Sequence, residues 1–141
     1  MSPEMDREAL GAFMADEFPQ MADEVAVESL GTDAITVRLM VKDKHLRPGG
    51  TVAGPAIFSL VDVAIYLMIL SRIGPVALAV TTNATIDFMR RPVSARDLLA
   101  DVRLLKLGRS LAVCDALVRS EGSDLPVARA SMTYAIPPSG R

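Results

Sequence analysis

The chain has 141 residues, half of them apolar, which is the size and composition of one folded domain and not of a disordered segment. Its net charge of −2 gives no sign of nucleic-acid binding, and its single histidine and single cysteine cannot supply four Cys or His ligands to a zinc ion. The lone cysteine fits a reducing compartment, and no basic segment followed by a short apolar core opens the sequence. We therefore expect a cytoplasmic protein.

The first half of the chain predicts a short helix, a hairpin and a long helix. Residues 4 to about 18 have an amphipathic pattern of helical period. Residues 25–30 and 34–41 surround a turn signal at 30–33, which predicts a hairpin. Gly54-Pro55 then opens a helix over about 55–71, because proline suits the first helical position, and Gly74-Pro75 ends it.

The second half predicts four strands, at 76–89, 98–107, 111–119 and 127–136, with a tight turn at Gly108-Arg109-Ser110. One long helix and an antiparallel sheet of about six strands form an α+β layer design. We divide the chain into an N-terminal helical segment, 1–24, and a main domain, 25–137.

Asp62 lies in the middle of the most apolar stretch, residues 51–70. A carboxylate there loses water at a high cost unless it is paired, protonated or faces a polar cavity. Ser59 and Tyr66 lie three and four residues away on the same helical face. We favour a catalytic or ligand-binding Asp62; the alternative is a structural acid held by Ser59, Tyr66 or a partner's backbone.

The same stretch is about as long as a membrane span, which needs roughly 20 apolar residues. Asp62 near its middle and Gly54-Pro55 in its first turn argue against a span. A core helix covered by a sheet explains the composition equally well, so we expect no membrane partner.

Sequence motifs of nucleophilic serine, phosphate-loop and dinucleotide sites are absent. His45 is the one histidine that a Ser-His-Asp triad could use, and no nucleophile motif lies near it; we interpret it as a solvated loop residue. Acid–base chemistry would then depend on carboxylates and backbone dipoles. The sequence predicts neither a cofactor nor a metal.

Four separate segments are similar to hotdog thioesterases of the phenylacetic-acid-degradation (PaaI) type. That family has a loop ending in His-Gly-Gly and an acid nine residues after the His; here Ala53-Gly54-Pro55 and Asp62 stand at these positions. The segments at 81–92, 107–110 and 127–134 match its later strands and hairpin. The resemblance implies the hotdog fold, a long central helix wrapped by an antiparallel sheet.

The resemblance also implies hydrolysis of acyl-CoA thioesters. Asp62 would be the nucleophile or the general base, the Gly54 N–H would polarise the thioester carbonyl, and Thr81 would help to place water. The other substrate-binding residues that we expect are Ala53, Pro55, Ser59, Tyr66, Asn83, Arg90, Arg91, Lys106 and Arg109. The resemblance implies that the last four meet the phosphates of coenzyme A.

Ala53 and Pro55 depart from the family's His and second Gly. These departures keep open a non-catalytic protein that binds acyl-CoA or an acyl chain on the same fold. A hotdog dehydratase is weaker, because such sites pair a His with an acid and His45 is poorly placed. Few aromatic residues and many Leu, Ile and Met favour an aliphatic acyl group.

Gly54 and Asp62 are eight residues apart, roughly 12 Å along one helix. One thioester carbonyl cannot contact both. A working site therefore requires Asp62 of one subunit to face Gly54 of another across a two-fold axis. We expect a homodimer or a dimer of dimers.

Overall fold

The computed structural model describes residues 4–138 and contains a sheet of six strands with helices on one side. The elements are α1 (Arg7–Glu17), α2 (Pro19–Ala22), β1 (Val25–Leu30), β2 (Ala34–Leu39), a 3-10 turn (Asp43–His45), α3 (Gly54–Ile73), β3 (Val80–Phe88), β4 (Leu98–Leu107), β5 (Leu111–Ser120) and β6 (Pro126–Ala135). The expected order is confirmed, with two differences. A second short helix, α2, follows α1, and β3 begins at Val80 because residues 76–79 form a turn closed by Ala79 N–H and the Val76 carbonyl.

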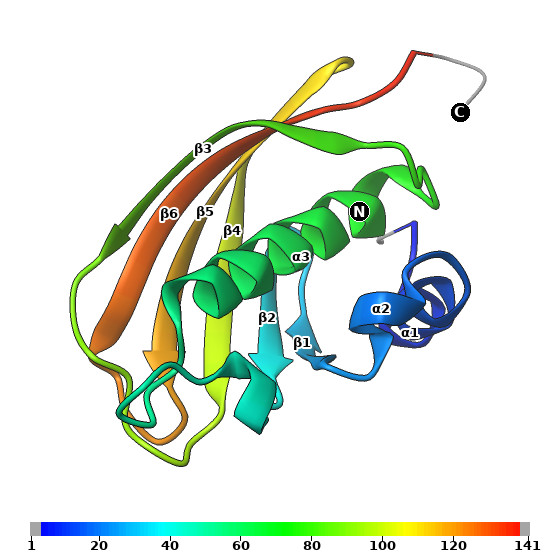
Figure 1. The fold of residues 1–141 in the computed structure, drawn as a ribbon. Coiled ribbons are helices and arrows are strands. Elements are labelled where there is room, and N and C mark those ends of the chain that lie inside the picture. Colours follow the sequence, from blue (N-terminus) through cyan, green and yellow to red (C-terminus); the bar gives the residue numbers. More distant parts are fainter. Residues whose placement is uncertain (1–3, 139–141) are drawn as a thin grey trace.

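The strands are antiparallel in the order β1-β2-β4-β5-β6-β3, and the sheet curves around α3 (Figure 1). This is the hotdog architecture. α3 has the length and hydropathy of a membrane span, but 67% of its most apolar 18-residue stretch is buried inside the protein. Contact with the curved sheet explains why the helix is apolar on nearly all sides.

α3 begins and ends where its sequence predicts. Pro55 occupies the first turn, and the N-terminal neighbour Ala53 is extended. At the other end Gly74 has φ 95°, a conformation that glycine adopts without steric cost. Its N–H donates to the Leu70 carbonyl at 2.8 Å, which ends the helix. These two ends fix which residues of α3 face the neighbouring strands.

β3 is one edge of the sheet and runs beside α3 in the opposite direction. Near its start, Thr81 contacts Asp62 of α3; at its end, the Phe88 ring lies against Gly54. Much of β3 is exposed, including Val80 at 55% and Phe88 at 53%. An exposed apolar edge strand is a ready surface for pairing with another chain.

Candidate active site

Asp62 is held by two hydroxyl groups that the sheet places side by side. Thr81 on β3 and Tyr134 on β6 are direct cross-strand partners. The Thr81 hydroxyl donates to Asp62 Oδ1 at 2.5 Å, and the Tyr134 hydroxyl lies 2.7 Å from the same oxygen. A register shift after Thr81 marks a bulge, a feature that re-aims side chains at an edge strand. Asp62 in the middle of α3 therefore meets its hydrogen-bond partners on the sheet.

The second carboxylate oxygen of Asp62, Oδ2, accepts none of the hydrogen bonds found among the described residues. Asp62 borders a cleft of about 440 Å³, which also touches Tyr66, Ala79 and Thr81. Burial raises the pKa of Tyr134 far above its ordinary value, and the nearby Asp62 carboxylate raises it further. Tyr134 therefore keeps its proton at neutral pH and donates a hydrogen bond to Oδ1, which leaves Oδ2 for a ligand.

The start of α3 supplies one unpaired backbone donor in the described structure. The N–H groups of Ala56 and Ile57 both turn back to the Ala53 carbonyl, and Pro55 has no N–H. Only Gly54 is left with an N–H that joins no such bond in the described residues. A helix N-terminus stabilises negative charge there, and the Phe88 ring shields one side of the position.

His45 is buried, at 6% exposure, so its interpretation as a solvated loop residue is wrong. Its Nδ1 accepts the Lys42 N–H at 2.8 Å, and its Nε2 lies 2.9 Å from Glu24 Oε1. Hydrogen bonds from Lys44 and then from His45 lower the pKa of Glu24. The ring cannot turn toward a substrate without breaking both contacts. Instead the His45 carbonyl accepts the Ala53 N–H at 2.8 Å, which ties this buried cluster to the start of α3.

Two of the residues expected to hold Asp62 do not do so. The Tyr66 hydroxyl donates to the Ala77 carbonyl at 2.9 Å, and Ser59 is exposed. Tyr66 still lines the Asp62 cleft, whereas Asn83 is exposed on β3. Sequence reasoning missed Tyr134 as a site residue. The sequence pattern that could have identified it is a tyrosine hydroxyl at the end of an alternating buried series on β6: Ala128, Ala130, Met132 and Tyr134.

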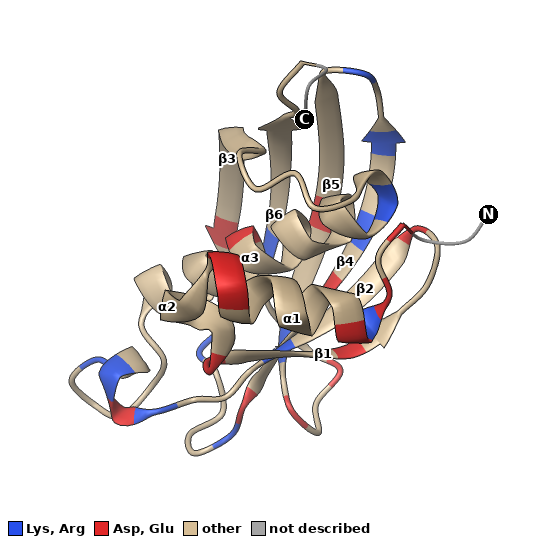
Figure 2. Ribbon diagram, turned by 90° about the vertical axis from the view of Figure 1, so that its right-hand side faces the viewer, with Lys and Arg blue, Asp and Glu red and all other residues tan. Residues whose placement is uncertain are grey.

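The structure separates the four basic residues expected at coenzyme A. Arg90 and Arg91 follow β3, and the Arg90 guanidinium donates to the Pro126 carbonyl at 2.6 Å. Lys106 and Arg109 lie at the end of β4 and in the turn to β5, at the opposite end of the sheet. Lys and Arg segments accordingly occur at both ends of the sheet in Figure 2. Within one chain, these two pairs cannot meet one phosphate group.

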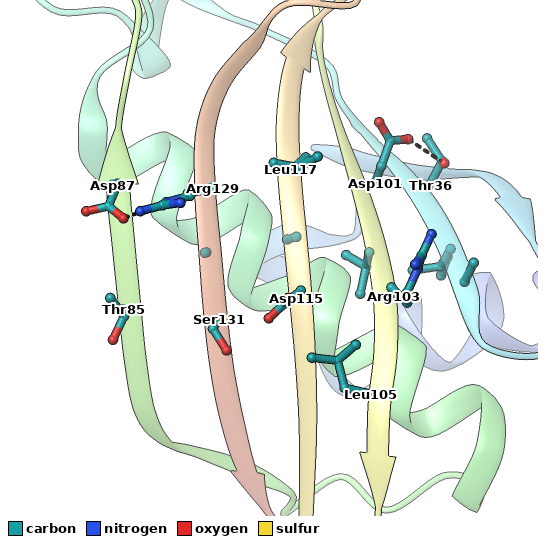
Figure 3. Close-up of a pocket in the computed structure, with 15 residues that line it drawn as sticks. Thr36, Thr85, Asp87, Asp101, Arg103, Leu105, Asp115, Leu117, Arg129 and Ser131 are labelled. Atoms are coloured by element: carbon teal, nitrogen blue, oxygen red, sulfur yellow. Dashed lines mark hydrogen bonds and ion pairs between the residues drawn. The ribbon is translucent and has the colours of Figure 1, made fainter.

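A larger cavity, of about 730 Å³, lies on the face of the sheet away from α3 (Figure 3). Four of its eight polar residues form two pairs, Asp87 with Arg129 at 2.9 Å and Thr36 with Asp101 at 2.8 Å. Neither Asp62 nor Gly54 reaches it. We place the candidate site at Asp62 and not in this larger cavity, because two hydroxyl groups converge on one oxygen of the Asp62 carboxylate and Asp62 lines the smaller cleft.

Comparisons with known proteins agree with this geometry. Residues 49–127 match the thioesterase superfamily, and no curated protein matches the chain. A crystal structure from a Silicibacter species, described as a candidate thioesterase, is 54% identical over 98% of this chain and 96% of its own, with a TM-score of 0.92. The phenylacetic acid degradation protein PaaI of Thermus thermophilus, as an N33D mutant, is 27% identical over 84% of this chain and 99% of its own, with a TM-score of 0.72.

A Streptococcus mutans protein bound to acetyl-CoA is also similar, at 26% identity over 81% of this chain and 89% of its own, with a TM-score of 0.70. The family match covers more than half of the chain and includes α3, β3 and the hairpin of β4 and β5. The chain therefore belongs to the thioesterase superfamily and is a thioester hydrolase of the PaaI-type hotdog fold.

Proposed function

We propose that the protein hydrolyses acyl-CoA thioesters, with Asp62 as the reacting carboxylate. The observation that carries this proposal is the orientation of Asp62. Two hydroxyl donors fix Oδ1, Oδ2 accepts no hydrogen bond from the described residues, and Asp62 lines a cleft large enough for a small ligand. A carboxylate oriented by its own hydrogen bonds is suited to act as a base or nucleophile. The acetyl-CoA bound to the similar Streptococcus mutans protein supports a coenzyme A thioester as the substrate.

As a general base, Asp62 Oδ2 takes a proton from a water molecule while the water oxygen bonds to the thioester carbon. The C–S bond then breaks, and the proton passes from Asp62 to the leaving thiolate. As a nucleophile, Oδ2 bonds to the carbonyl carbon itself, the thiolate leaves, and water opens the resulting anhydride. Both routes place negative charge on the carbonyl oxygen, which requires a donor such as the Gly54 N–H.

The two halves of this site lie at opposite ends of β3, and pairing of two β3 edges would bring them together. Within one chain, Thr81 marks the Asp62 end and Phe88 marks the Gly54 end. Antiparallel pairing about a two-fold axis near Ala84 and Thr85 would set Thr81 opposite Phe88 of the partner subunit. Asp62 would then approach the partner's Gly54, and the exposed apolar residues of β3 would be covered. We propose this homodimer as the active form.

A second candidate function, binding of acyl-CoA without hydrolysis, rests on a specific observation at the start of α3. Ala53 and Pro55 stand where the related family has His and Gly, so this end offers one free backbone donor and no side-chain donor. Hydrolysis is the better supported function, because a binding protein has no need of an oriented carboxylate with an open oxygen.

Release of free thiol from a panel of acyl-CoA esters tests the proposal. Asp62→Asn should lower turnover at least about a hundredfold, the low end for loss of a positioned acid or base, and the variant should remain folded. The control is Asp115→Asn, an exposed acid on the outer face of β5. Equal turnover by wild type and Asp62→Asn would refute the role of Asp62. Binding of acyl-CoA with no turnover by the wild type would establish the second function.

A further inference from the structure

One wall of the Asp62 cleft comes from outside the hotdog elements. Glu17, Phe18 and Gln20 line the cleft together with Asp62 and Tyr66. They belong to the corner between α1 and α2, which precedes every strand of the sheet (Figure 1) and lies outside the family match at 49–127. The cleft thus combines Asp62 of α3 and the hydroxyl groups of β3 and β6 that hold it with a wall that the sheet does not fix.

A row of aromatic rings leads from the carboxylate to this wall. Tyr66 follows Asp62 by about one helical turn. Its ring lies 6.1 Å from the Tyr134 ring at an angle of 30°, and 6.4 Å from the Phe18 ring at 83°. The hydrogen bond to the Ala77 carbonyl fixes the Tyr66 ring in place. Apart from Thr81, which holds Asp62, the rest of the lining is small or aliphatic: Val63, Ala77, Ala79 and Val80.

Phe18 has a fixed backbone although it stands in a corner between two helices. Its N–H donates to the Met14 carbonyl at 2.9 Å, which closes α1. Its own carbonyl accepts the N–H groups of Met21 and Ala22, which open α2 after Pro19. The side chain is half-buried against Tyr66. Such a ring is a defined wall and not a loose surface side chain.

We propose that this cleft receives the acyl group of the thioester and that Phe18 sets the acyl length which it accepts. This inference rests on the proposed function, because it takes Asp62 as the position of the reacting carbonyl. From Asp62 the acyl chain passes Tyr66 and ends against Phe18. The mainly aromatic and aliphatic lining suits an uncharged acyl group of limited length. Phe18 is a specificity-determining residue and takes no part in bond breaking.

Binding of S-alkyl-CoA thioethers tests the proposal, because these compounds resemble the substrate and cannot be hydrolysed. The thioethers carry straight chains from two to twelve carbons, and their dissociation constants are measured by calorimetry. We expect affinity for the wild type to rise roughly fourfold with each methylene that the cleft buries, and then to stop rising at one length. Phe18→Ala should move that length upward by two carbons or more, and Phe18→Trp should move it downward.

Two further variants make the result specific. Phe18→Leu keeps an apolar side chain in the corner and should give an intermediate shift, which remains measurable if Phe18→Ala does not fold. Phe13→Leu alters a ring that contacts Tyr66 at 6.1 Å but does not line the cleft, and it should leave the preferred length unchanged.

The outcomes separate this inference from the proposed function. The same preferred length in the wild type, Phe18→Leu and Phe18→Trp would overturn the role of Phe18 and leave hydrolysis standing. A shift in thioether length in a protein that cleaves no acyl-CoA would support the role of Phe18 and refute hydrolysis. Failure of every thioether to bind the folded protein would refute both.

Discussion

The Tyr134 hydroxyl lies 2.7 Å from Asp62 Oδ1 and 3.0 Å from the main-chain carbonyl of the same residue. One group on β6 therefore contacts both the side chain and the backbone of the residue in the middle of α3. With Thr81 at 2.5 Å from Oδ1, the carboxylate is fixed in direction and in distance from the sheet. The reactivity that we propose for Oδ2 depends on this arrangement.

Removal of either hydroxyl should impair turnover more than substrate binding. Tyr134→Phe and Thr81→Val each take one donor from Oδ1, so the carboxylate loses its fixed orientation. We expect kcat to fall about ten- to hundredfold, with a smaller change in KM. The matched control is Thr36→Val, which removes the same kind of Thr–Asp hydrogen bond, at 2.8 Å to Asp101, on the outer face of the sheet. An equal loss of kcat in Thr36→Val and Thr81→Val would assign the effect to the fold and not to Asp62.

Each active site should require two subunits. Asp62→Asn and Gly54→Val homodimers should both be inactive. The first lacks the reacting carboxylate, and in the second a Cβ already lies 3.5 Å from the Phe88 ring, so the valine methyl groups would crowd the free N–H. In a mixed dimer one site carries both defects and the other carries neither. Co-expression with two different tags should therefore recover up to half of the wild-type activity. A purified heterodimer that is folded, paired and as inactive as its parents would show that the site lies within one chain.

Coenzyme A phosphates should meet one of the two basic pairs more strongly than the other, because the pairs lie at opposite ends of the sheet. We compare Arg90→Gln/Arg91→Gln with Lys106→Gln/Arg109→Gln. The pair that binds phosphate should raise KM for acyl-CoA and not for acyl-pantetheine, and the rise should shrink at high salt, where exposed charges are screened. If neither double variant changes the KM for acyl-CoA more than the KM for acyl-pantetheine, the phosphates bind elsewhere.

Stability should fall in alkaline solution because three buried groups hold their protons. Burial raises the pKa of Tyr66 and Tyr134 above the ordinary value of 10.0 and raises that of Cys114 from 9.0 to about 12. The unfolded chain releases these protons first, so their contribution is complete below about pH 9 and is lost as the pH rises. The slope is about 1.4 kcal/mol per pH unit for each group. Urea unfolding between pH 8 and 11 should show this loss, and Tyr134→Phe and Cys114→Ala should each make it shallower; unchanged slopes would contradict the assignment.

The sequence alone determined the order of the six strands and of α3, the limits of α3 to within two residues and the exceptional position of Asp62. These are local properties. Pro55 and Gly74 act on their own turns, and the cost of an acid within an apolar helix is visible without knowing its neighbours. The resemblance of four segments to one family also depends on short stretches of residues, and the fold confirms it.

Only the tertiary structure decided the partners of these residues. Tyr134 reaches Asp62 because the register of β6 on β3 sets it opposite Thr81, and no local pattern encodes that pairing. His45 is buried because its ring forms a hydrogen bond with Glu24, which is distant in sequence. The basic residues separate because antiparallel strands send successive turns to opposite ends of a sheet. Phe18 becomes a wall of the cleft through packing against Tyr66, a contact between segments that share no periodicity.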